Sequence, residues 1–234
     1  MANATSVSGS GDLANITFEV IGAPPAATAL TIDSAQLNDG AIGVELSHGI
    51  FAVNGLFSVS GQVDYYSGGP VPGVDLSMVG VGVHNTVTGP DGAFVLNDIP
   101  TGTFTLTPSK SDEVREITAF DASLVLQDAA GLIDLSPNQV LAADVNRNGS
   151  VAALDASDIL AASVGLQPVP FQGAGRVWDF VPQDRGYALL NDDQTGQDFT
   201  ALLIGDVSGS WSTDADPPPA PAALSTSSES AQLA

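Results

Sequence analysis

The hydrophobic pattern changes twice along the chain. Up to about residue 108, apolar and polar residues alternate, as they do from Leu13 to Val20, and such alternation predicts β-strands with one buried face. Between 109 and 167 the apolar residues recur at helical spacing, and from 168 to 216 short alternating runs return. Residues 217–234 are rich in Pro, Ala and Ser and are predicted to be disordered. The pattern predicts a mainly β protein with a small α part.

Turn residues divide the first part of the chain into two β regions. Residues 1–55 hold three or four short strands, with a predicted hairpin turn at Asn38-Asp39-Gly40. Residues 56–108 hold a second set, separated by Pro-Asp-Gly and Pro-Thr-Gly turns. The few strands of the first region need a partner face. The strands within 168–216, which hold both tryptophans, are expected to pack back on the second β region or on the helical part.

The helical part contains a duplication. Residues 117–133 and 151–167 align without a gap at an offset of 34 positions. In each copy an acid stands where the N-cap or first turn of a helix belongs, a placement that also suits the helix dipole, and a Gly ends the helix. The matched residues include Asp121 and Asp155, Ala122 and Ala156, Ser123 and Ser157, and Gly131 and Gly165.

Oxygen donors precede the second copy at regular spacing. Asp144, Asn146 and Asn148 alternate with other residues, Gly149 follows, and Asp155 closes the set eleven residues after Asp144. This is the register of an EF-hand-type calcium loop, with donors at positions 1, 3 and 5, Gly at 6 and an acid at 12. Ca²⁺ is a hard cation that takes about six to eight oxygens, so a loop of this composition predicts a calcium site.

The remaining loop positions fit the same register. Ser150, at position 7, would supply its main-chain carbonyl, and Val151, at position 8, is expected to point into the core. Gly149 would take the positive φ that the sharp turn requires. The alternative for any short Asp/Asn/Gly run is an ordinary turn with local side-chain hydrogen bonds. The duplication favours the calcium interpretation here.

The first copy departs from this register. Counting back from Asp121 puts Lys110 at position 1, where a cation cannot be a ligand. Two interpretations remain. Either Asp112, the carbonyl of Glu116 and Asp121 hold an ion in a shifted loop, or the loop is metal-free and Asp121 acts only as a helix cap.

A third set of donors occurs near the end of the chain. Asp206, Ser208 and Ser210 repeat positions 1, 3 and 5 of a loop, but position 6 is not Gly and no helix follows. A turn is the preferred interpretation, and a further ion is the alternative.

Composition excludes several classes of partner. The chain has 27 acidic residues against five Lys and Arg, a net charge of −22 and a pI of about 4.1. This charge argues against binding to nucleic acids or anionic membranes, and it suits a protein that binds cations or works in saline surroundings. There is no cysteine, no apolar run that would span a membrane, and no signal peptide at the start, so an exported protein is expected to be represented here by a fragment or mature form.

No residues suggest catalysis. The sequence has no G-x-S-x-G or H-E-x-x-H motif, and His48 and His84 lie far apart in strand-like regions. The pair Asp192-Asp193 stands in a polar turn, and neighbouring residues on a strand point in opposite directions. Tyr65 and Tyr66 can form a platform for a sugar, but aromatic residues packed on a sheet are the preferred interpretation. We expect the chain not to be an enzyme.

Three stretches resemble bacterial extracellular modules. Residues 109–167 resemble a type I dockerin, a pair of calcium loop-helix motifs related by a pseudo-twofold axis. Residues 1–55 are similar to the C-terminal strands of a cohesin-type jelly roll, as in GSGDLANITFEVIG and LTIDSAQLNDGAIGVELSHGIFAV. Residues 56–108 resemble a carboxypeptidase-regulatory-like or prealbumin-like β-sandwich, as in PVPGV and TGPDGAF.

The dockerin resemblance implies Ca²⁺ as the cofactor and a cohesin-like module as the partner. It implies docking through helix faces around Ala122, Ser123, Ala156 and Ser157, in two opposite poses. Phe120 and Leu154 are expected to pack in the core. The first hypothesis is therefore a calcium-dependent assembly module, secreted or at the cell surface, of a polysaccharide-degrading or similar system. The second is a structural subunit of a surface layer or filament, in which another copy completes the N-terminal β region and calcium only rigidifies the subunit.

Overall fold

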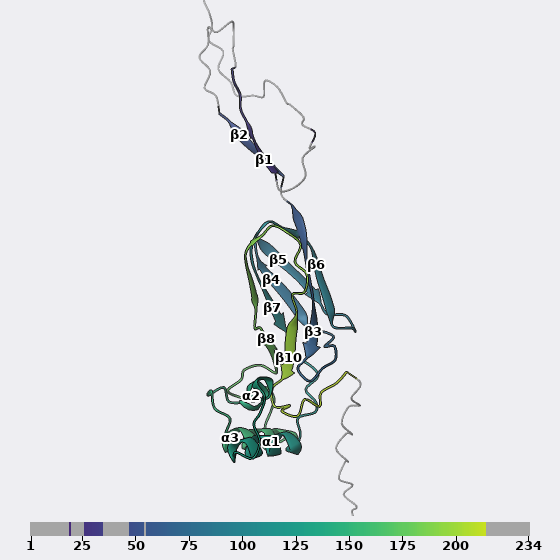
Figure 1. The fold of residues 1–234 in the computed structure, drawn as a ribbon, viewed down its shortest axis with the longest axis vertical. Helices are drawn as coiled ribbons and strands as arrows, with labels where there is room; N and C mark the ends of the chain where they lie inside the picture. The colour runs from purple at the N-terminus through teal and green to yellow at the C-terminus, as the bar shows by residue number, and fades with distance from the viewer. Residues whose placement is uncertain (1–18, 20–25, 35–46, 54, 214–234) are drawn as a thin grey trace, which may run out of the picture. The chain divides into compact units, whose positions relative to one another are not determined.

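The computed structural model describes residue 19, residues 26–34 and 47–53, and residues 55–213 (Figure 1). The predicted turn at Asn38-Asp39-Gly40 and the predicted tail at 217–234 lie outside this part of the chain. Two compact units are distinguished, Met1–Gly55 and Leu56–Ala234.

The first unit contains an antiparallel pair of strands, β1 (Ala26–Leu30) and β2 (Gly49–Val53). The amide of Ile32 donates a hydrogen bond to Nδ1 of His48 at 3.2 Å, next to the pair. Ile50 of β2 is 80% exposed. A pair of strands alone is marginally stable in water, and the sequence analysis expects the strands of this region to need a partner face.

The second unit is a β-sandwich with helices inserted into it, which confirms a mainly β fold with a small α part. One sheet has the order β6-β3-β10-β8 and the other the order β5-β4-β7-β9. The strands before the helices are β3 (Leu56–Tyr65), β4 (Asp75–Gly80), β5 (Gly82–Val87), β6 (Ala93–Pro100) and β7 (Gly102–Ser109). The strands after them are β8 (Trp178–Val181), β9 (Arg185–Leu190) and β10 (Phe199–Leu203).

Strands from both sides of the helices share each sheet. β10 lies between β3, to which it is parallel, and β8, to which it is antiparallel, while β9 pairs with β7. A boundary after residue 108 therefore separates strands that are hydrogen-bonded neighbours. Local periodicity identifies a strand but not its partner, and these partners are distant in sequence. The segment expected to pack back is an integral part of the sandwich.

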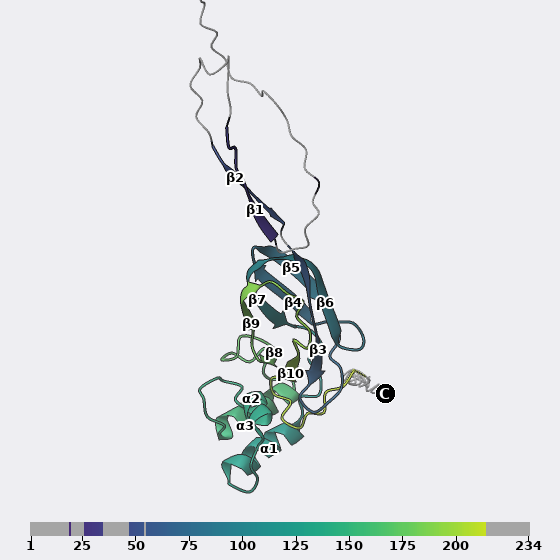
Figure 2. The same ribbon diagram turned by 45° about the horizontal axis from the view of Figure 1, so that its top comes forward.

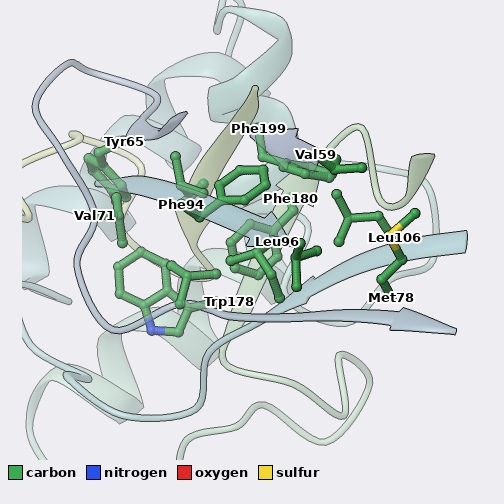
Figure 3. Packing of buried hydrophobic residues seen from close by; sticks show 14 of the residues in the cluster. Val59, Tyr65, Val71, Met78, Phe94, Leu96, Leu106, Trp178, Phe180 and Phe199 are labelled. Atoms are coloured by element: carbon green, nitrogen blue, oxygen red, sulfur yellow. The ribbon is translucent and has the colours of Figure 1, made fainter. Parts of the chain in front are cut away.

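Buried aromatic and aliphatic residues fill the space between the two sheets, as Figure 3 shows. The Trp178 ring meets that of Tyr65 at a centroid distance of 5.8 Å and that of Trp211 at 4.9 Å. Tyr65 is buried and Tyr66 packs partly buried against the same core. The preferred interpretation as a packed strand residue is thus confirmed for Tyr65, at the end of β3, whereas Tyr66 packs against the core from the turn that follows the strand. His84 lies in β5 with its ring against Phe104.

Three helices follow β7 and gather at one end of the sandwich, as seen in Figures 1 and 2. They are α1 (Ala119–Ala129), α2 (Pro137–Ala143) and α3 (Ala153–Ser163). The start of α2 has two sequence signals, a capping box from Ser136 to Gln139 and a proline in the first turn. None of the helices within the described residues has the length and hydrophobicity needed to cross a membrane.

The helices have a core of their own. Ala122 and Val125 of α1 pack with Ala156 and Ile159 of α3. Ile204 and Val207, which directly follow β10, are completely buried in the same cluster. The amide of Gly205 also donates to the carbonyl of Ala142 at 2.9 Å. The chain beyond the last strand is therefore built into the helical core.

Candidate metal centre

The loop between α2 and α3 is shaped by hydrogen bonds to the side chain that opens it. The carboxylate of Asp144 accepts from the amide of Asn148 at 3.1 Å and from that of Gly149 at 2.9 Å. Arg147 and Gly149 have positive φ values of 57° and 84°. The sequence predicts this conformation for Gly149, which lacks the Cβ that makes it unfavourable. The chain thus turns back sharply after Asp144.

Asp155 closes the loop from the first turn of α3. Its side chain is completely buried, and Oδ1 accepts from the amide and the Nδ2 of Asn146 at 3.4 and 2.8 Å. Its Oδ2 accepts from the amide of Ala152 at 3.0 Å, at the N-terminus of the helix. Burial raises the pKa of Asp155, and the charge of Asp144 adds to this effect. The two carboxylates of the loop therefore lie close enough to interact.

The neutral donors complete the turn. Oδ1 of Asn146 accepts from the amide of Asn148 at 3.1 Å, and Oδ1 of Asn148 accepts from the amide of Ser150 at 2.8 Å. Ser150 is exposed, and Val151 packs partly buried against the helical core, as predicted. The five residues predicted as ligands of this loop are thus part of one continuous turn that ends in α3.

The chemistry of these donors suits calcium. Two carboxylates, two side-chain amides and the carbonyl of Ser150 are hard oxygen ligands, and Ca²⁺ accepts such mixtures with water in the remaining positions. Within the described ranges, no group of three or more His, Asp or Glu side chains is placed to hold a metal ion. A cation in this loop would therefore be held by two acids and by neutral oxygens.

The start of the first copy has a different role. Nζ of Lys110 lies 2.8 Å from Oδ1 of Asp112 and donates to the carbonyl of Pro72 at 3.1 Å. The lysine side chain is 1% exposed, whereas that of Asp112 is 68% exposed. The hydrogen bond from Lys110 holds the pKa of Asp112 below its usual value. Asp112 is thus engaged with Lys110 at the edge of the sandwich, and its assignment as a calcium ligand stays a prediction.

Asp121, in contrast, is completely buried at the N-terminus of α1. Its Oδ2 accepts from the amide and the hydroxyl of Thr118, both at 2.8 Å, which completes a capping box. The predicted capping role of Asp121 is therefore confirmed. Its Oδ1 accepts from the amide of Ser208 at 2.7 Å. The segment after β10 thus reaches the helix that belongs to the first copy.

Asp206 is the centre of that segment. It is completely buried, and its Oδ1 accepts from the hydroxyl of Ser208 at 3.0 Å and the amide of Ser210 at 3.1 Å. Its Oδ2 accepts from the hydroxyl of Tyr65 at 2.7 Å and the amide of Trp211 at 2.8 Å. Burial raises the pKa of Asp206. Sequence reasoning noted the spacing of these residues but did not connect them with Asp121.

Two of the four residues predicted to bind a partner are buried between the helices. Ala122 is 4% and Ala156 is 3% exposed, because both form the contact between α1 and α3, so neither can meet a partner. Ser157 is exposed and Ser123 half-buried. Phe120 and Leu154, which the sequence analysis assigned to the core, are each 61% exposed. The two helices pack through Ala122, Val125, Ala156 and Ile159, and Phe120 and Leu154 point outward.

Comparisons with known proteins add no assignment. The chain matches no protein-family model, no curated protein and no solved structure.

Proposed function

We propose that this chain is a non-catalytic, calcium-binding module for protein–protein assembly, secreted or displayed at a cell surface. The observation that carries the proposal is the loop from Asp144 to Asp155. Its oxygen donors have the spacing of a calcium loop, and its main-chain hydrogen bonds hold two carboxylates in one turn. The similar helix that precedes it, α1, supports a duplicated loop-helix module.

Calcium would act on this module through charge. The carboxylates of Asp144 and Asp155 repel each other, and a divalent cation between them removes that repulsion. The ion would fix the end of α2 relative to the start of α3. Binding only to the folded state adds about 2.7 kcal/mol of stability when free calcium exceeds its Kd by about 100-fold.

The docking faces would be the outward sides of α1 and α3. Matched residues of the two copies are exposed to similar degrees: Phe120 and Leu154 at 61% each, and Leu126 and Leu160 at 49% and 47%. Ser157 lies exposed on α3, and Ser123 half-buried on α1. Two similar apolar surfaces support docking of a cohesin-like partner in either of two poses. The exposed residues take the place of Ala122 and Ala156 in this proposal.

The acid pair at 192–193 supports a non-catalytic interpretation. Oδ1 of Asp193 accepts from the amide of Ser58 at 2.7 Å and from its hydroxyl at 3.1 Å. Oδ1 of Asp192 accepts from the amide of Asp193 at 2.9 Å. The carboxylate of Asp193 thus holds the connection between β9 and β10 against β3, and that of Asp192 caps the same turn.

Calcium titration of the Asp144→Asn variant tests the proposal. Asn keeps the size of the side chain but removes one of the two charges in the loop. We expect the affinity of this loop for calcium, measured by isothermal titration calorimetry, to fall by more than the roughly 10- to 100-fold that loss of an outer-shell partner costs. Asp75→Asn, which removes an exposed acid of β4, should leave it unchanged. Full affinity in Asp144→Asn would refute the proposal.

A second candidate function is a subunit of a surface layer or filament. The observation that favours it is the β1–β2 pair, which has only two described strands and leaves Ile50 exposed. A strand from another copy would complete it. Size-exclusion chromatography separates the two candidates. Long polymers of the purified chain support the filament, whereas a monomer that binds a recombinant cohesin module with calcium, but not with EGTA, supports the assembly module.

A further inference from the structure

We infer that the chain binds a second calcium ion in a split site, formed by residues 206–211 after β10 and residues 116–121 at the start of α1. The inference rests on the proposed calcium binding of the loop from Asp144 to Asp155 and extends it to residues from two distant parts of the chain. Asp206, Ser208 and Ser210 would supply side-chain oxygens, Glu116 its carbonyl, and Asp121 the closing carboxylate.

The first half of the split site repeats, residue by residue, the start of the loop from Asp144 to Asp155 (the continuous loop). Oδ1 of Asp206 accepts from the amide of Ser210, four positions later, at 3.1 Å. Oδ1 of Asp144 accepts from the amide of Asn148, also four positions later, at the same distance. The second oxygen of each accepts from the amide five positions later, at 2.8 Å from Trp211 and 2.9 Å from Gly149. The residue at the fourth position has a positive φ in both turns, 71° at Gly209 and 57° at Arg147.

The second half repeats the closing of the loop. Asp121 accepts from the amide of Thr118 at 2.8 Å, three positions earlier, as Asp155 accepts from Ala152 at 3.0 Å. Its other oxygen accepts from the amide at the third position of the opening turn, Ser208, at 2.7 Å. In the continuous loop, the corresponding amide of Asn146 lies 3.4 Å from Asp155.

The carbonyl at the seventh position also has its counterpart. Glu116 stands two positions before Thr118, the N-cap residue of α1, as Ser150 stands two positions before Ala152, the N-cap residue of α3. Its carbonyl accepts from the hydroxyl of Ser210 at 3.5 Å, so it lies at the split site. The ligand positions of one loop therefore all recur in the other, although Ser208 follows Asp121 by 87 positions.

The charge of the split site indicates a cation. Asp121 and Asp206 are completely buried, and their hydrogen-bond partners are amides and hydroxyls. The ion pairs within residues 55–213 use Asp112, Glu113 and Asp179 instead. Buried carboxylates are ordinarily balanced by a cationic side chain or a metal ion. The mixture of carboxylate, hydroxyl and carbonyl oxygens selects a hard cation such as Ca²⁺ over softer metals.

The two tryptophans provide a signal specific to this site. The chain has two in all, and Trp211 donates its amide to Asp206 while its ring contacts that of Trp178 at 4.9 Å. The continuous loop contains no tryptophan. Calcium in the split site is therefore expected to change the intrinsic fluorescence, and calcium in the continuous loop is expected to leave it nearly constant.

Calorimetry and fluorescence titrations of the full chain with CaCl₂ test the inference together. The wild type should bind two ions, and Asp206→Asn and Asp144→Asn should bind one each. The fluorescence change should be lost in Asp206→Asn and kept in Asp144→Asn. Asp75→Asn should behave as the wild type.

A double Ser208→Ala, Ser210→Ala variant keeps both carboxylates and should bind the second ion at least about 10-fold more weakly. It replaces Asp206→Asn if that variant does not fold.

The outcomes distinguish the two proposals. One ion in the wild type, lost in Asp144→Asn and kept in Asp206→Asn, would overturn the split site and leave the proposed function intact. Two ions in both Asp206→Asn and the double serine variant would also overturn it. No calcium binding by the wild type would overturn the proposed function itself.

Discussion

At the scale of single residues, Lys110 occupies a ligand position by spacing but has a structural role in the fold. Counting from Asp121 gives Lys110 the place of a first ligand. The structure buries its side chain in the sandwich, with Nζ 5.8 Å from the centre of the Trp178 ring and bonded to the carbonyl of Pro72. The lysine therefore anchors the chain where it leaves β7, and the proposed split site has Asp206 in the corresponding ligand position.

We predict that Lys110→Met lowers the free energy of unfolding by about 1–2 kcal/mol. Methionine preserves the packing of the aliphatic stem but removes the hydrogen bond to Pro72 and the contact with the Trp178 ring. The cost stays moderate because Asp112 is largely exposed and remains hydrated. Urea denaturation measures the difference. Asp112→Asn should cost less, and a Lys110→Met variant more stable than the wild type would contradict this role.

The sequence predicted the candidate site as far as its ligands are contiguous. The loop from Asp144 to Asp155 follows from spacing alone, because its turn is formed by bonds between near neighbours. The capping role of Asp121 also follows from local pattern. The contact between Asp121 and Ser208 does not, because it depends on how β10 directs the chain toward α1. Local patterns contain no information about such an approach.

At the scale of elements, the helical pair shows the limit of periodicity. Each copy has apolar residues on more than one side, so spacing alone does not say which side faces the other helix. The residues in the contact are Ala122, Val125, Ala156 and Ile159, and Phe120 and Leu154 lie outside it. The helices α1 and α3 approach closely at Ala122 and Ala156, and larger side chains at these two positions would separate them.

We predict that Ala156→Leu destabilises the protein although it adds a hydrophobic side chain, whereas Leu154→Ser has little effect although it removes one. Ala156 is 3% exposed, so a larger side chain overpacks the helical core and costs about 1–3 kcal/mol of unfolding free energy. Leu154 is 61% exposed, so its replacement changes stability by less than about 0.5 kcal/mol. Thermal unfolding followed by circular dichroism compares the two. A larger loss in Leu154→Ser than in Ala156→Leu would show that the buried face has been assigned incorrectly.

At the scale of the whole second unit, the sequence predicted the strands of the sandwich more reliably than their partners. Alternation and turns marked strands on both sides of the helices, and the structure confirms strands there. Their arrangement in two mixed sheets depends on pairing between residues such as Phe199 and Val63, which no local pattern specifies. Because β10 leads directly into Ile204 and Val207, the sandwich and the helical core share one continuous segment.

This shared segment predicts that the sandwich and the helices unfold together. Ile204 is completely buried in the helical core, immediately after β10, and Ile204→Ala should cost about 2–5 kcal/mol of unfolding free energy. Far-ultraviolet circular dichroism, which reports the helices, and tryptophan fluorescence, which reports the sandwich, should then shift to lower denaturant by the same amount. Leu189→Ala, at a position 61% exposed in β9, should shift neither. Coupling through a common core requires both signals to respond to the loss of one buried side chain. If Ile204→Ala moved the helical transition alone, the helices would therefore be an independent folding unit, and the segment after β10 would only connect them to the sandwich.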